Sequence, residues 1–531
     1  MSEKVLGALL VLLLGACAQM REITGGDKDE KGPQLIDAVP ANGSTLFSSD
    51  NILLHFDERI QLERVRERLL ISPPLDAMPE VHIARGSDVE IELKAPLRPN
   101  TTYTFSLGET VKDLTEGNYA AGMDYVISTG AALDSAAMIG DVRDAFTGEA
   151  KKDVLVMLHH DGDTSNFTNS RPVYATRTDK NGHFHLKHLS VGDYRITALR
   201  DQNANYEFDL PNEEVAFSST PISATVVDTT TMPLQLALFQ ELGAVQRIRE
   251  LLVEADGDAR IVFARPAEHV ALRDLERSGS SLKWTEEWSA ARDTVVLWPS
   301  DTTALGDGRY EISTEAGIID TVRYRRLKKM PFYTGVHAHM ISDKDPRIVI
   351  TADRPIESVD AERMTLVADS TTIPFTLAQD TTNARRIEMR ASLLPGQKAV
   401  LTLLPKALHD IYRGYNDTLR APVGRSEEAK SGTLRVTIES AASPAGKLIL
   451  HLLNKQGHVV RNLQVILGEP VVMEGLDPGE HTLRLIADAN GNGRWDTGQW
   501  SAGVQPETVW HYVEPLNVRA AWDLGIVWKL K

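Results

Sequence analysis

Hydrophobic and polar residues alternate in short runs along most of the chain, and Gly, Pro, Asn and Asp separate these runs. A period of two is typical of half-buried β-strands, and few stretches follow the 3.6-residue period of a helix. Residues 62–70, which carry a charged face, are a local helical exception. The pattern predicts an all-β protein built from tandem β-sandwiches. A length of 531 residues allows about three to five domains, each with its own core.

An internal similarity divides the chain. Residues 52–60 align with 348–356 at an offset of 296, and 97–117 align with 394–414 at an offset of 297, which places Asn100 opposite Gln397. A third, degenerate copy starts near Ile261. These segments resemble the bacterial Ig-like module of S-layer proteins. The resemblance implies Ig-like domains at 33–130 and 332–424 and a degenerate Ig-like β domain at 243–328.

A second similarity pairs residues 192–201 with 479–488. Upstream of the first copy, Asp179-Lys180-Asn181-Gly182 is a hairpin signal, and Leu-x-x-Gly-x-Tyr leads into the next strand. This pattern resembles the transthyretin-like sandwich of carboxypeptidase regulatory domains and collagen-adhesin repeats, which carries no catalysis in carboxypeptidases. The resemblance implies two such domains, at 136–225 and 431–531. The C-terminal copy lacks the Asp-x-Asn-Gly hairpin.

The N-terminus predicts a lipid anchor. Residues 1–16 contain an apolar run, 5–14, that is too short to span a bilayer and fits a signal peptide. Small residues then precede Cys17, the only cysteine, in a spacing that resembles the bacterial lipobox. The resemblance implies that Cys17 is acylated and that 17–32 form a flexible tether. The alternative is an ordinary signal peptide followed by a chance cysteine.

The residues around the end of the predicted tether resemble those of a known family. Residues 25–29, Pro33 and the Val-Pro-Ala-Asn-Gly-Ser run at 39–44 resemble the opening of Bacteroidota lipoproteins with Ig-like domains. The resemblance implies an outer-membrane lipoprotein. Surface display in that phylum goes with acidic residues after the cysteine, and Ala18, Gln19 and Met20 stand there instead. Both membrane faces therefore stay open, and the surface is favoured.

The net charge and the cysteine content limit the classes of binding partner and of metal site that the chain can have. Lys and Arg number 57 against 74 Asp and Glu, a net charge of −17. This balance argues against nucleic acid and against polybasic docking to anionic lipid. One cysteine excludes an internal disulfide framework and a multi-cysteine zinc site. The expected partners are the membrane, other outer-membrane proteins and, in the alternative function below, a glycan.

Two Asx-rich loops are candidate calcium sites. Both follow the strand that ends each transthyretin-like repeat, and both place oxygen ligands at loop positions 1, 3, 5 and 9. The residues are Asp201, Asn203, Asn205 and Asp209 in the first loop and Asp488, Asn490, Asn492 and Asp496 in the second. Two carboxylates per loop and a missing Glu at position 12 predict binding near 10⁻⁴–10⁻³ M. The alternative is a metal-free loop of Asx turns.

Other candidate chemistry is weaker. The pairs His183/His185 and His337/His339 alternate on strands, yet polar surface residues explain them better than a transition metal does. Asp-Ser/Thr triplets resemble O-glycosylation acceptors of Bacteroidota envelope proteins, and turn-into-strand chemistry explains them equally well. Tryptophans crowd the last 40 residues; they favour core packing over sugar stacking.

Two functions of different classes follow. The first is a non-enzymatic, outer-membrane-anchored lipoprotein that acts as a structural and protein-interaction scaffold, an accessory subunit in β-barrel assembly or nutrient uptake. The second is a glycan- or matrix-binding adhesin-like surface lipoprotein that uses the tryptophans and the Asx loops. An enzyme ranks third because the sequence has no Gly-x-Ser-x-Gly, His-Glu-x-x-His or phosphate-binding loop.

Overall fold

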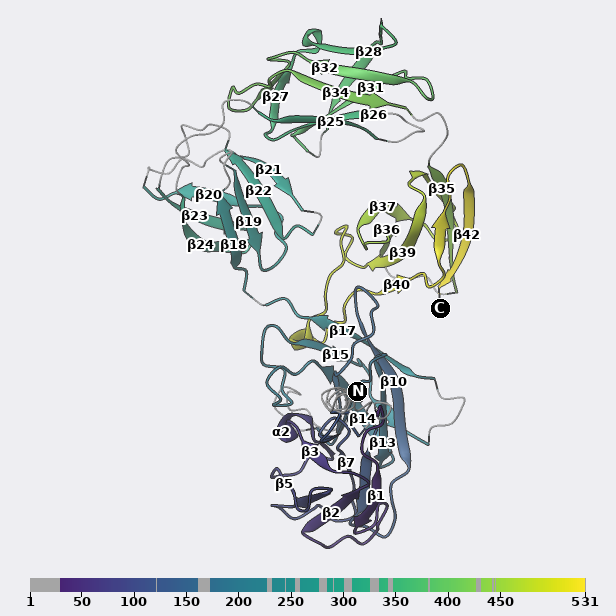
Figure 1. Ribbon diagram of the computed structural model, residues 1–531. Helices are drawn as coiled ribbons and strands as arrows, with labels where there is room; N and C mark the ends of the chain where they lie inside the picture. The colour runs from purple at the N-terminus through teal and green to yellow at the C-terminus, as the bar shows by residue number, and fades with distance from the viewer. Residues whose placement is uncertain are drawn as a thin grey trace, which may run out of the picture.

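The computed structural model confirms an all-β chain (Figure 1). It describes residues 29–120, 122–160, 172–226, 232–243, 245–253, 258–276, 284–289, 291–299, 308–324, 334–341, 347–380, 383–425, 431–441, 444 and 446–530. The helical exception is one short turn, α2 (Val65–Arg68), and two 3₁₀ turns are η1 (Ala361–Arg363) and η2 (Trp500–Ala502). None of the helices in these residues is long and apolar enough to cross a membrane.

The first sandwich packs a four-stranded sheet, β1-β2-β6-β5, on a three-stranded sheet, β4-β7-β9, with a short β3-β8 pair beside them. Alternating strand residues such as Ile52, Leu54 and Phe105 are fully buried between the sheets. The strands are β1 (Leu35–Val39), β2 (Asn51–Phe56), β3 (Ile60–Leu62), β4 (Leu70–Ser72), β5 (Glu80–Ile83), β6 (Asp88–Glu92), β7 (Thr102–Ser106), β8 (Val111–Asp113) and β9 (Asp124–Ser128).

The fourth sandwich repeats this order, with sheets β25-β26-β31-β30 and β29-β28-β32-β34 and the pair β27-β33. Its strands are β25 (Val336–Ile341), β26 (Arg347–Ala352), β27 (Ile356–Val359), β28 (Met364–Ala368), β29 (Thr371–Thr372), β30 (Phe375–Gln379), β31 (Arg386–Ala391), β32 (Lys398–Leu403), β33 (Leu408–Asp410) and β34 (Leu419–Gly424).

The third sandwich has the two larger sheets only, β18-β19-β22-β21 and β20-β23-β24, among its described residues. Its strands are β18 (Ile248–Val253), β19 (Ala259–Phe263), β20 (Ala271–Asp274), β21 (Trp284–Trp288), β22 (Thr294–Pro299), β23 (Gly308–Thr314) and β24 (Gly317–Tyr324).

One turn corrects the alignment of the first and fourth sandwiches. Asn100 and Gly396 both have left-handed backbone, at φ 50° and 80°, a conformation that Gly and Asn tolerate better than other residues. Asn100 therefore corresponds to Gly396, at an offset of 296, and the expected match with Gln397 is wrong. The strand registers Thr104↔Val126 and Val400↔Pro422 keep the same offset.

The second sandwich is an eight-stranded sheet, β12-β11-β14-β15-β17-β10-β13 with β16 on β14, wrapped around one core. Its first and last strands, β10 and β17, pair in parallel. The strands are β10 (Ala136–Asp144), β11 (Leu155–His160), β12 (Tyr174–Arg177), β13 (His183–Leu189), β14 (Gly192–Leu199), β15 (Glu214–Phe217), β16 (Ile222–Ala224) and β17 (Leu234–Gln240).

The fifth sandwich pairs its strands in the same way, including the parallel first and last strands, with one difference. Among the described residues β40 does not pair with β42 as β15 pairs with β17, so the strands form two sheets, β38-β35-β42 and β37-β36-β39-β40 with β41 on β39. The strands are β35 (Gly432–Ser440), β36 (Lys447–Asn454), β37 (Val459–Val465), β38 (Val471–Leu476), β39 (Gly479–Asp488), β40 (Val509–His511), β41 (Leu516–Val518) and β42 (Asp523–Leu530).

The chain turns back on itself (Figure 1). The third and fourth sandwiches lead away from the second, and the fifth returns so that its β40 side lies beside β15 and β17. The contacts that join the fifth sandwich to the second come from one loop and one sheet face of the fifth sandwich.

Candidate functional site

The second Asx loop is held by two carboxylates. Asp488, at the end of β39, accepts hydrogen bonds from the backbone N–H groups of Gly491, Asn492 and Gly493 at 2.7, 3.0 and 2.9 Å. Glu507, just before β40, accepts from Ala489 N and Asp496 N at 2.7 and 3.0 Å. Burial, followed by the charges of Asp496 and Asp488, raises the pKa of Glu507.

The first Asx loop is built in the same way. Asp201 accepts from the backbone N–H groups of Asn203, Asn205 and Tyr206. Glu213, which is fully buried, accepts from Gln202 N and Asp209 N at 3.0 and 3.1 Å. Glu213 and Glu507 therefore have the same role. The calcium-loop spacing places Glu213 one residue after position 12 of the first loop and does not reach Glu507, so the sequence predicted neither carboxylate as an acceptor of backbone N–H groups.

In each loop the two Asn side chains converge on the second Asp. Asn203 and Asn205 donate to Asp209 at 3.2 and 2.9 Å. Asn490 and Asn492 donate to Asp496 at 2.5 and 2.6 Å. A cation at this point would require the amides to present oxygen instead of NH₂. Calcium stays a prediction, since no group of three or more His, Cys, Asp or Glu suited to a metal occurs in the described residues.

The second loop is longer by seven residues. Glu213 follows Asp209 by four positions in the sequence, whereas Glu507 follows Asp496 by eleven. The extra length contains η2 and Trp500. We call residues 495–505 the docking loop because their side chains contact the second sandwich.

Polar contacts of the docking loop are made to strand ends. Thr497 donates to the backbone oxygen of Gln240 at 2.8 Å, Ser501 donates to Glu241 at 3.1 Å, and Gln505 donates to the backbone oxygen of Phe217 at 2.8 Å. Backbone oxygens at the ends of β15 and β17 thereby gain partners from another domain.

Aromatic packing forms the centre of this contact. The Trp500 ring lies 5.1 Å from the Phe217 ring and 6.4 Å from the Phe208 ring, and the Trp495 ring lies 4.9 Å from the Phe146 ring. Trp528 belongs to the fifth core, and Trp522 is 61% exposed. The tryptophans near the C-terminus therefore divide between core, domain contact and surface.

A sheet face completes the contact. His451, Arg484 and His511 are neighbours on β36, β39 and β40, and Phe146 of the second sandwich contacts Arg484 and His511. The Arg484 guanidinium lies 3.8 Å from the Phe146 ring centre, and His511 Nε2 donates to the Phe146 carbonyl at 3.1 Å. Burial, aided by Arg484, lowers the pKa of His451 to about 4, and burial also lowers the pKa of His511.

Two glycines allow the close approach. A Cβ on Gly148 would stand 2.7 Å from His511 Nδ1, and a Cβ on Gly498 would stand 2.6 Å from Phe239 Cζ. Contacts under 3 Å between these atoms are repulsive, so both positions need glycine for the domains to meet.

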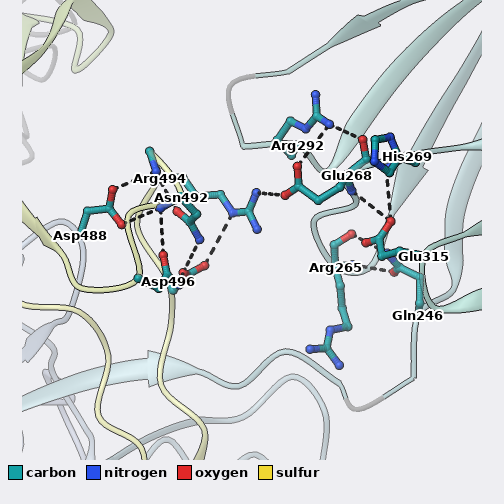
Figure 2. Close-up of polar contacts among 12 residues, drawn as sticks. Gln246, Arg265, Glu268, His269, Arg292, Glu315, Asp488, Asn492, Arg494 and Asp496 are labelled. Carbon is teal, nitrogen blue, oxygen red and sulfur yellow. Dashed lines mark hydrogen bonds and ion pairs between the residues drawn. The ribbon is translucent and has the colours of Figure 1, made fainter. Parts of the chain in front are cut away.

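One ion pair links Arg494, the residue just before the docking loop, to the third sandwich (Figure 2). Arg494 Nη1 lies 3.1 Å from Glu268 Oε1, and Glu268 also contacts Arg292 of its own sandwich. Glu315 accepts from the backbone N–H groups of Glu268 and His269 and fixes this turn. Arg494 and the docking loop together therefore contact two sandwiches.

The other candidates lie apart from this contact. Cys17 lies outside the described residues. His183 and His185 are exposed on β13, as are His337 and His339 on β25, and the nitrogen Nδ1 of His183 pairs with Asp141.

A groove of about 330 Å³ lies between the first and second sandwiches. Leu69 and Ile71 form its apolar side, and the first Asx loop supplies Asp201, Asn205 and Tyr206 to its lining.

Comparison with known proteins gives one family match. Residues 29–129 match the family profile of the bacterial Ig-like domain, which supports the Ig-like prediction for the first sandwich. No curated protein matches the chain.

Several solved structures align with the chain at low similarity. The Bacillus anthracis TIE protein is 10% identical over 100% of this chain and 79% of its own, with a TM-score of 0.14. The S-layer protein rSbsC(31-844) is 10% identical over 86% and 64%, at 0.14. The Bacteroides ovatus mixed-linkage glucan utilization protein SGBP-B is 12% identical over 73% and 96%, at 0.20. Scores of this size do not establish a common arrangement of the domains.

Proposed function

We propose that this chain is a non-enzymatic scaffold of the bacterial cell envelope. Acylated Cys17 and the tether 17–32 anchor it to the outer membrane, and five β-sandwiches form its body. The observation that carries the proposal is the docking loop. Its tryptophans and polar side chains contact the second sandwich, and Arg494 just before it contacts the third, so this segment sets how the sandwiches are arranged.

The scaffold presents its surface to other outer-membrane proteins, as an accessory subunit of a machine for β-barrel assembly or nutrient uptake. Parts of this surface are apolar: Val191, Met232 and Val513 are more than four-fifths exposed. Exposed apolar side chains of this size are suited to protein contacts when they gather in patches.

The test is mild-detergent purification of the tagged full-length protein from its own membranes, followed by mass spectrometry. Stoichiometric barrel and lipoprotein partners are expected. The matched control is Cys17→Ser, which should leave the membrane fraction and lose those partners. A protein that purifies alone, with Cys17 acylated, would contradict the subunit role.

One observation favours a second candidate, binding of a glycan. The groove between the first two sandwiches combines an aromatic ring, Tyr206, with Arg177 and Asn205, a lining suited to hydroxyl groups. Tyr206→Ala should then weaken retention on a polysaccharide panel, whereas Trp522→Ala should not. Equal, flat binding by both variants and the wild type would exclude the glycan.

A further inference from the structure

The fourth sandwich has an uncovered apolar sheet face. Val367, Val400 and Pro422 are cross-strand neighbours on β28, β32 and β34, and all three point away from the core. Val367 is 36% exposed and Val400 is 44% exposed. They line a shallow groove of about 640 Å³ with Asp369 and Lys398 at its rim.

The matching face of the first sandwich is a domain contact. By strand register Ser72, Thr104 and Val126 correspond to Val367, Val400 and Pro422. Ser72 Oγ accepts from Ala175 N of the second sandwich at 3.0 Å, and Val126 is only 7% exposed.

The neighbouring apolar contact has the same partners. Leu70 packs into a cluster of residues from the second sandwich. The cluster comprises Leu155, Met157, Ala175 and Leu199.

The linker from the first sandwich to the second has the same length as the linker from the fourth sandwich to the fifth. Seven residues, 129–135, lie between β9 and β10, and seven, 425–431, lie between β34 and β35. The fifth sandwich follows the fourth through a link as long as the one that joins the second to the first. A link of this length allows the fifth sandwich to reach the same relative position.

The fifth sandwich carries the matching surface. Strand registers place Ile449, His451, Asn462 and Ile486 where the second sandwich has Leu155, Met157, Ala175 and Leu199. Here His451 and Arg484 on this face contact each other, and Arg484 contacts Phe146. This face of the fifth sandwich contacts the second sandwich and corresponds, by strand register, to the face with which the second sandwich contacts the first.

We propose that the face of β28, β32 and β34 is a second docking site for the fifth sandwich, filled when the docking loop leaves the second sandwich. The chain then alternates between a closed arrangement, described above, and an open one in which the two halves are equivalent pairs. The two positions exclude each other because both use the face that carries His451.

Disulfide trapping tests this in the full chain. In a Cys17→Ser background, Val367→Cys with Asn462→Cys copies the Ser72–Ala175 contact of the first pair. Adding Trp500→Ala, which removes the ring between Phe208 and Phe217, should speed the intramolecular disulfide about tenfold or more, the change expected for about 1.4 kcal/mol of released docking free energy.

The control pair is Val359→Cys with Asn462→Cys, since Val359 is 37% exposed on β27, away from the groove. Trp522→Ala is the control for Trp500→Ala. Phe146→Ala releases the same contact from the second sandwich and replaces Trp500→Ala if that variant does not fold. Equal trapping of both cysteine pairs, or disulfides only between molecules, would overturn the proposal.

Discussion

Arg354 is a buried cation, 1% exposed, whose Nη1 lies 3.0 Å from Asp410 Oδ2. At the matching positions the first sandwich has Glu58 and Asp113, and Asp113 is satisfied by four backbone N–H groups instead of an arginine. Burial, followed by the Asp113 charge, raises the pKa of Glu58. The same backbone thus accommodates opposite charges at one position.

Arg354→Met should destabilise the fourth sandwich by about 3–5 kcal/mol, because Asp410 is left buried without its counter-charge. Arg354→Met with Asp410→Asn should recover part of this loss. Arg363→Met, which removes an exposed partner of Asp360, should cost less than about 0.5 kcal/mol. Denaturant unfolding of the full chain measures all three, and equal midpoints for Arg354→Met and Arg363→Met would contradict the prediction.

The histidines of the docking face predict a pH dependence. The docked state holds His451 and His511 neutral, with pKa values below the ordinary 6.5, while the undocked state protonates them first. Docking should therefore weaken through His451 as the pH falls from about 6.5 toward 4, and the lowered pKa of His511 acts in the same direction.

The groups that face these histidines are Arg484, which opposes their protonation, and Asp144, which favours that of His511. Thermal unfolding of wild type and His451→Gln between pH 7.5 and 4 isolates the effect from the titration of carboxylates. The difference between the two proteins should shrink on acidification. A difference independent of pH would contradict the role of His451.

The calcium prediction has its own test. Millimolar calcium should raise the unfolding temperature if Asp209 and Asp496 with their Asn partners bind the ion at 10⁻⁴–10⁻³ M. Asp496→Asn should abolish the part of the shift that comes from the second loop, and Asp134→Asn, outside both loops, should leave it unchanged. If the unfolding temperature does not change when calcium is added, the two loops are metal-free Asx-turn structures.

The docking loop is the element that distinguishes the two related sandwiches. Trp500→Ala should weaken docking by about 1.4 kcal/mol or more, since it removes a large ring from between Phe208 and Phe217. Amide hydrogen exchange at β15 and β17 should increase, while exchange in β36 should remain slow. Trp522→Ala should change neither. Unaltered protection at β15 in Trp500→Ala would show that the loop does not hold the two sandwiches together.

Sequence periodicity predicts elements better than their contacts. Alternation in 52–56 and 348–352 predicts both strands, and the Asx spacing locates both loops, because these signals are local. The role of Glu507 is harder to predict, since it depends on folding of an insertion between Asp496 and β40. The insertion is visible only after Glu213 and Glu507 are known to correspond.

The arrangement of the whole molecule depends on contacts between distant positions. His511 and Phe146 are 365 residues apart, and Arg494 and Glu268 are 226 apart. Each of these side chains resembles an ordinary surface residue in the sequence. Composition and pattern therefore predict the sandwiches but not the return of the fifth to the second.

At the scale of the whole molecule, the contacts between different sandwiches should stabilise one another. Arg385 of the fourth sandwich makes a bidentate ion pair with Glu287 of the third, with N–O distances of 3.0 Å. In a closed chain, Arg385→Glu alone should change the radius of gyration little, because the docking loop still holds the other end. Arg385→Glu with Trp500→Ala should expand the molecule by more than the sum of the single effects.

Small-angle scattering measures the radius of gyration of the wild type, Arg385→Glu, Trp500→Ala and the double variant, and these four proteins form a double-mutant cycle. Arg385→Glu with Glu287→Arg restores the ion pair in reverse, so adding this swap to Trp500→Ala should give the size of Trp500→Ala alone. Strictly additive sizes would mean that the junctions act independently and that docking of the fifth sandwich does not constrain the third and fourth. A larger combined effect would mean that the closed path of the chain, more than any single contact, keeps these sandwiches in place.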